Sequence, residues 1–289
     1  MAETNQKEHK MLTTALQYAE KAEKLCVLPD VYLRLQEMMD DEQSTLADIA
    51  GIIALDPALT SKLLKVANSA LFNFPREIGT ISKALAVLGI NEVRNLINTY
   101  GVTSAFATID TSIIDMDRFW EVSVDCALLC KYLAQKKNIK NAKGLFVSGL
   151  LHNIGELVVM QTDPKKAQYC QDYDKNETPW QRQQDVFGFT YADCSAELLN
   201  LWQLPQSIIS PIEQYHQAYS EDKDEAISLL YICTRLALLN SHPGMYSKKS
   251  FVGQHIMDDL GITFDDLDEA VNFCNIEGMS ILSALSLKA

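Results

Sequence analysis

The sequence predicts an all-α protein. Apolar side chains recur three or four positions apart in nearly every segment, which is the period of an amphipathic helix. Residue pairs that start helices also recur along the chain. No segment alternates polar and apolar side chains as a half-buried strand does, and no repeat of fixed length is present.

Helix starts carry recognisable capping residues. Thr45 and Asp48 have the spacing of a capping box, and so do Thr263 and Asp266. In Asp56-Pro57 the aspartate can cap free amides, and the proline stands where no N–H is needed. The periodicity predicts further helices at 5–25, from about 117, at 141–160, 191–202, 205–219 and 223–240. The segment 141–160 is apolar nearly all round, so we expect one central helix there.

Composition limits the possible partners. The chain has 289 residues with a formal net charge of −13, which disfavours general binding to nucleic-acid phosphates. No apolar run approaches the roughly 18 residues that cross a bilayer, and the first residues lack a secretory signal. We expect a cytoplasmic protein that binds neither membranes nor nucleic acid. Cys126 and Cys130 share a helix face and are interpreted as small core residues.

The segment 81–97 has the form helix, Leu-Gly, helix, which also occurs in DNA-reading helix-turn-helix motifs. Its second helix offers only Arg94 as a cation, beside Glu92. A packing hairpin between two helices is therefore the preferred interpretation.

Several short motifs together resemble the HDOD domain, a bacterial relative of the HD phosphohydrolases. They are "LP" at 28–29, "IIALDPALTSKLLKVANSALF" at 52–72, "IGTISKALAVLGINEVRNL" at 78–96, "FW" at 119–120, "FVSGLLHNIG" at 146–155 and "LLNLWQLP" at 198–205. The resemblance covers roughly residues 25–240. It implies a two-lobed fold, with an N-terminal helical lobe at 1–115 and an HD-like helical bundle at 116–289.

The resemblance also implies where a metal site would lie. HD hydrolases hold a divalent cation with a histidine, a His-Asp doublet and a later aspartate, and the cation lowers the pKa of a bound water. In this chain His152 matches the histidine of the doublet, but Asn153 replaces its aspartate. The remaining positions of this degenerate pocket are Val122, Tyr191, Tyr215, His216 and Thr234.

Loss of the carboxylates predicts weak metal binding, because neutral imidazoles and an amide cannot compensate a divalent charge. We therefore expect no metal cofactor. Asp125 and Asp193 lie within a turn of lost ligand positions and are the candidate replacement ligands. For His152 the preferred interpretation over a metal ligand is a core histidine whose ring nitrogen bonds a carbonyl or amide. His9, His242 and His255 fall in tail or loop contexts.

The predicted function is that of a non-catalytic signalling protein that binds a protein partner, with a degenerate pocket that either binds a small ligand or is simply filled. Its acidic surface favours a partner with a basic patch. One alternative is a phosphohydrolase or phosphodiesterase with altered ligands, which would need Mn, Fe or Mg. Another is a nucleotide or cyclic-dinucleotide sensor without turnover.

Overall fold

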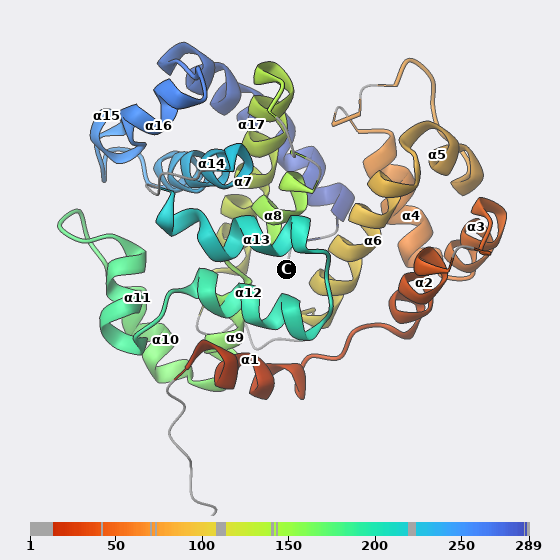
Figure 1. The fold of residues 1–289 in the computed structure, drawn as a ribbon, viewed down its shortest axis with the longest axis horizontal. Helices are drawn as coiled ribbons and strands as arrows, with labels where there is room; N and C mark the ends of the chain where they lie inside the picture. Colours follow the sequence, from red (N-terminus) through yellow and green to blue (C-terminus); the bar gives the residue numbers. More distant parts are fainter. Residues whose placement is uncertain are drawn as a thin grey trace, which may run out of the picture.

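The computed structural model describes residues 14–287 apart from 42, 70, 73, 108–113, 140, 141, 143, 219–223 and 286. Every regular element of this described part is helical, which confirms the all-α prediction (Figure 1). The elements are α1 (Ala15–Glu23), α2 (Asp30–Asp40), α3 (Leu46–Ala54), α4 (Pro57–Ala67), α5 (Ile81–Leu88), α6 (Ile90–Ala105), α7 (Met116–Lys137), α8 (Leu145–Leu151), α9 (Ile154–Thr162), α10 (Pro164–Cys170), α11 (Pro179–Phe187), α12 (Tyr191–Leu201), α13 (Gln206–Gln214), the 3₁₀ helix η1 (Tyr215–Gln217), α14 (Glu225–Ser241), α15 (Lys248–Phe251), α16 (Gln254–Asp259) and α17 (Phe264–Leu285).

The predicted capping residues start the helices as expected. Thr45 and Asp48 form a reciprocal capping box at α3. The Asp56 side chain accepts from the amides of Ala58 and Leu59 at the start of α4. These bonds satisfy amides that have no partner within the helix, and each such cap stabilises a helix by about 1 kcal/mol.

The longest helices organise the second half of the chain. α7 packs against α8, α14 and α17, and α12 packs against α9 and α13. Helices α2 to α6 lie together at one side of the molecule, where α17 reaches α4 (Figure 1). One continuous buried core joins the two regions. The division into lobes at residues 115 and 116 remains a prediction.

Helix α1 packs against α9 and α12 although it precedes α2 to α6 in the sequence. Its buried face consists of Tyr18, Ala19 and Ala22. The Tyr18 ring lies edge-on to Phe187 and Phe189, with centroids 5.6 and 5.3 Å apart. Figure 1 shows α1 beneath α9 and α12. Residues 5–13, the start of the helix predicted at 5–25, lie outside the described part.

The prediction of one helix over 141–160 is wrong. The chain forms α8 and α9 instead, with His152 as the C-cap residue of the first and Asn153 as the N-cap residue of the second. Uniform apolarity hid the break, because both short helices are buried on all sides. The helix predicted over 205–219 is also shorter than expected, because α13 ends at Gln214 and the 3₁₀ helix η1 follows it.

Three other expectations have a clear outcome. α5 and α6 form the predicted hairpin, and the Arg94 guanidinium binds Asp40 at 2.5 Å. Cys126 and Cys130 are fully buried thiols, as expected of core residues. Within the described residues, no helix combines the length and the apolarity that crossing a bilayer requires.

Candidate functional site

A cavity of about 360 Å³ lies in the second half of the molecule. Its walls come from the first turns of α7, the α8–α9 junction, the loop between α10 and α11, the start of α12, η1 and α14. All seven residues that the sequence assigned to a degenerate pocket line it: Val122, His152, Asn153, Tyr191, Tyr215, His216 and Thr234. Tertiary packing thus brings together positions that are more than a hundred residues apart.

His152 is held in one orientation by the end of its own helix. Its ring is 5% exposed, and its Nδ1 lies 2.7 Å from the carbonyl oxygen of Gly149. A carbonyl can only accept, so Nδ1 carries the proton and Nε2 is the unprotonated nitrogen. Burial lowers the pKa of His152 to about 4, which keeps the ring neutral at physiological pH. This is the bonded core histidine that the sequence left open, and it also faces the cavity.

Asn153 is engaged with a carboxylate. Its Nδ2 donates to Oε2 of Glu156 at 2.5 Å, and Nε2 of Gln171 donates to Oε1 of Glu156 at 3.5 Å. Burial raises the pKa of Glu156 to about 7, although both hydrogen bonds oppose the shift. Near neutral pH this carboxyl group therefore exists in both protonation states.

The opposite wall carries the second imidazole. The His216 ring lies 4.1 Å from the Tyr215 ring and 5.3 Å from the Trp180 ring, measured between centroids. Burial, and then the positive charge of Arg235, lower the pKa of His216 to about 3. Arg235 is itself buried and lies 4.5 Å from the centroid of the Trp180 ring. His152 and His216 are therefore neutral at pH 7.

Tyr191 enters the cavity from the first turn of α12. Its amide donates to Oε1 of Gln183 at 2.8 Å, and its carbonyl oxygen packs against Gly155. A Cβ atom at Gly155 would lie 2.1 Å from that oxygen, so only glycine allows α9 to approach α12 this closely. The Tyr191 side chain is 4% exposed, and its hydroxyl has no nitrogen or oxygen hydrogen-bond partner among the described residues.

The two remaining predicted positions supply little chemistry. Thr234 Oγ1 donates to the carbonyl oxygen of Tyr231 at 3.1 Å, as a helical threonine commonly does. Val122 is half-buried and gives the cavity an apolar wall.

The candidate replacement ligands lie outside the cavity lining. Asp125 accepts a hydrogen bond from Nδ2 of Asn240 at 2.7 Å, and burial raises the pKa of its carboxyl. Asp193 closes the capping box of α12 by accepting from the amide and hydroxyl of Thr190 at 2.7 and 2.8 Å. Both carboxylates thus have structural partners.

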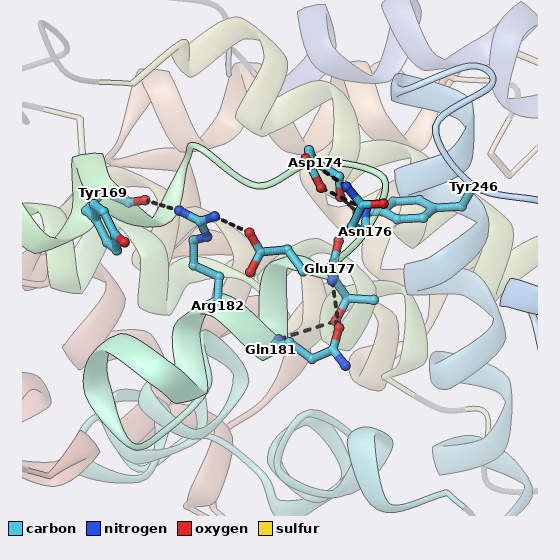
Figure 2. Close-up of polar contacts among 8 residues, drawn as sticks. Tyr169, Asp174, Asn176, Glu177, Gln181, Arg182 and Tyr246 are labelled. Carbon is cyan, nitrogen blue, oxygen red and sulfur yellow. Dashed lines mark hydrogen bonds and ion pairs between the residues drawn. The ribbon is translucent and has the colours of Figure 1, made fainter.

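The loop between α10 and α11 brings Gln171 and Tyr173 to the cavity. Figure 2 shows how polar contacts hold this loop. Arg182 pairs with Glu177, and the hydroxyl of Tyr246 donates to the carbonyl oxygen of Glu177 at 2.7 Å. Another capping box, between Thr178 and Gln181, starts α11 directly after the loop. The rim therefore has a defined shape.

Sequence reasoning missed several lining residues. Of these residues, Glu156 is the one that the sequence indicates most clearly. It follows His152 by four positions, and in a helix this spacing places two side chains on nearly the same face. His242 was expected in a loop or tail, and it lies at the C-cap of α14 where a loop begins; it also lines the cavity, with its Nε2 3.3 Å from the hydroxyl of Tyr173. Nothing local in the sequence links Tyr173 or Trp180 to this site, because distant helices bring them there.

The donor set does not fit a catalytic divalent cation. Within the described part of the chain, no three His, Cys, Asp or Glu side chains converge as a metal-binding group. The amide of Asn153 is hydrogen-bonded to Glu156, and Asp115, which also lines the cavity, accepts from the amide of Arg118 as the N-cap residue of α7. A divalent ion needs anionic oxygen ligands to offset its charge, and the Glu156 carboxyl group alone provides too little.

Comparison with known proteins identifies the family. The family model of the HDOD domain matches the sequence over residues 25–218, which is most of the chain. The chain belongs to the HDOD domain family. The match ends somewhat before residue 240, where the sequence resemblance was expected to end. Helices α14 to α17 follow the matched region, and α14 completes the cavity wall.

Solved structures share the HDOD fold across nearly the whole chain. A Shewanella amazonensis protein provisionally named a phosphohydrolase is 23% identical with a TM-score of 0.72, and the match covers 94% of this chain and 98% of that one. A Marinobacter aquaeolei protein provisionally named a signal transduction protein is 19% identical with a TM-score of 0.69, over 93% and 60% of the two chains. At these identities the likeness shows the fold alone.

A curated relative of unassigned function from Treponema pallidum is 25% identical over 205 residues. The match covers 70% of this HDOD chain but 39% of the relative's length.

Proposed function

We propose that this HDOD protein is a non-catalytic signalling protein whose cavity binds a small molecule in place of a catalytic metal ion. The proposal rests mainly on the hydrogen bond from the Asn153 amide to the Glu156 carboxyl group. In the proposed correspondence with HD hydrolases, the neutral amide of Asn153 stands where those enzymes have a charged ligand. Neutral His152 and His216 add no negative charge.

The shape and lining of the cavity support ligand binding. Its volume of about 360 Å³ falls within the range of about 300–1,000 Å³ that small-molecule sites occupy. The lining combines aromatic rings with a few amide, imidazole and carboxyl groups, which is the usual composition of such sites. We propose that ligand binding is relayed to a protein partner in the cytoplasm. The net charge of −13 favours a partner with a basic patch over membranes or nucleic acid.

The alternative function is a metal-dependent phosphohydrolase, as the name of the Shewanella protein suggests. Metal analysis of the purified protein, together with a phosphodiesterase assay in added Mn²⁺, separates the two. We expect substoichiometric metal and no chelator-sensitive hydrolysis. One equivalent of tightly bound iron or manganese, with turnover that a chelator abolishes, would overturn the proposal.

A thermal-shift screen tests ligand binding directly. A ligand that binds the native state raises its stability in proportion to the logarithm of concentration over Kd. Including nucleotides and cyclic dinucleotides also tests the sensor alternative.

A further inference from the structure

The inner wall of the cavity holds a carboxyl group that has no basic partner. Glu156 accepts hydrogen bonds only from the side-chain amides of Asn153 and Gln171, at 2.5 and 3.5 Å, in the described part of the chain. None of the ion pairs between described residues includes Glu156. A carboxylate removed from water gains most from a cation that brings N–H donors.

A hydroxyl without a strong hydrogen-bond partner also lines the cavity. Tyr191 is buried, and among the described residues its hydroxyl has only the thiol of Cys170, a weak partner, beside it. Glu156 and Tyr191 line the same cavity, and burial followed by the charge of Glu156 raises the pKa of the Tyr191 hydroxyl. A buried hydroxyl without a strong hydrogen-bond partner costs free energy. Such a hydroxyl therefore marks a place where a ligand can supply the missing partner. Its oxygen can accept an N–H donor that also reaches Glu156.

The rest of the lining suits an organic cation. Phe119, Tyr173 and Tyr215 present aromatic rings to the cavity. The faces of such rings attract ammonium and guanidinium groups. A protein with a net charge of −13 also raises the local concentration of cations.

The positive side chains near the cavity have other contacts. Arg118 donates to the carbonyl oxygen of Ser241 at 2.7 Å. Arg235 lies against the rings of Trp180 and Tyr231, at 4.5 and 3.4 Å from their centroids. Arg118 also lines the cavity, but neither arginine is paired with Glu156 in the described part of the chain.

We infer that the cavity binds a small organic cation of the guanidinium or primary-amine class, with its N–H groups on the Glu156 carboxylate and the Tyr191 hydroxyl. The aliphatic or aromatic body of the ligand lies among Phe119, Tyr173 and Tyr215. This inference rests on the proposed function, because it names the ligand class for the same cavity.

Calorimetric titration of the full chain with n-butylguanidinium tests the inference, and n-butylurea is the uncharged probe of the same shape. We expect one butylguanidinium per chain and no binding of butylurea. Glu156→Gln keeps the acceptor for Asn153 but removes the charge, so we expect Kd to rise about 10- to 100-fold. Tyr191→Phe keeps the ring, and we expect a rise of about 3- to 10-fold.

Glu197→Gln on α12 is the matched control, because it makes the same change of charge outside the cavity lining. We expect it to bind like the parent protein. Equal binding by parent and Glu156→Gln, or no binding of butylguanidinium at roughly 10 mM, would overturn the inference. Thermal unfolding of each variant verifies that it is folded.

The outcomes separate this inference from the proposed function. If nucleotides stabilise the protein and butylguanidinium does not, the ligand class is wrong and the binding function stands. If Mn²⁺-dependent ester hydrolysis appears, the proposed function fails whatever the cation does.

Discussion

Asn153 donates a 2.5 Å hydrogen bond to the carboxyl group of Glu156, and this pair forms the inner wall of the cavity. An amide and a carboxyl group so paired form a polar, hydrogen-bonded surface. That surface selects ligands with N–H groups and is poor at holding a bare divalent ion.

The first prediction concerns the pH dependence of Glu156. Its pKa is raised from 4.5 to about 7 in the folded protein, so the native state binds a proton that the unfolded chain releases between these values. The free energy of unfolding therefore falls as pH rises from 4.5 to 7, and this cost persists above pH 7. We expect Glu156→Gln to stabilise the unliganded protein at pH 8 by about 1–2 kcal/mol, with little effect at pH 4.

Urea denaturation of parent and variant across this pH range measures the difference. A variant that is less stable than the parent at pH 8 would mean that the ionised carboxyl has a stabilising partner in the folded protein.

The second prediction concerns His152, whose shift has the opposite sign. Burial lowers its pKa from 6.5 to about 4, so the unfolded chain binds a proton that the native state excludes. The contribution of neutral His152 is fully present above pH 6.5 and is lost as pH falls toward 4. Between pH 7.5 and 5 we expect the parent to lose about 2 kcal/mol of stability relative to His152→Gln. Parallel stability curves for the two proteins would contradict the assignment.

The third prediction tests whether the cavity corresponds to the metal site of HD hydrolases. Asn153→Asp combined with Val122→His adds one carboxylate and one imidazole to the wall that holds His152 and Glu156. We expect tighter Mn²⁺ binding than in the parent, because anionic ligands compensate the charge of the ion. Metal uptake after dialysis measures the change, with Asp125→Asn as a control outside the lining. If the double variant retains no more manganese than the parent, the positional correspondence is wrong.

The fourth prediction concerns the contact that places Tyr191. Gly155→Ala would put a Cβ atom 2.1 Å from the carbonyl oxygen of Tyr191 and 3.0 Å from Cys194 Cβ. Backbone atoms cannot move aside without distorting the helix, so we expect the free energy of unfolding to fall by about 2–4 kcal/mol and Tyr191 to be displaced. Gly51→Ala is the control, since Gly51 is exposed on α3 and nothing lies within 4 Å of its added Cβ. It should stabilise by up to about 1 kcal/mol. Equal effects of the two substitutions in thermal unfolding would show that the α9–α12 contact is loose.

Several features of the fold could be predicted because they are encoded locally. The pairs Thr45 with Asp48 and Thr263 with Asp266 start α3 and α17, since a side chain three residues away can reach a free amide. The break at His152 and Asn153 could not be predicted, because apolar residues on every side fit one buried helix as well as two.

The sequence by itself determined the helical class and the helix starts, because each depends on neighbours in the chain or on residue type. Only the tertiary structure decided that Glu156, Tyr191 and His242 share a cavity with His152. It also decided that Asp125 and Asp193 have other partners. The physical reason is that burial and hydrogen bonding set the protonation state of a side chain and decide which of its donors and acceptors stay available. Burial and hydrogen bonding in turn depend on residues brought from distant helices.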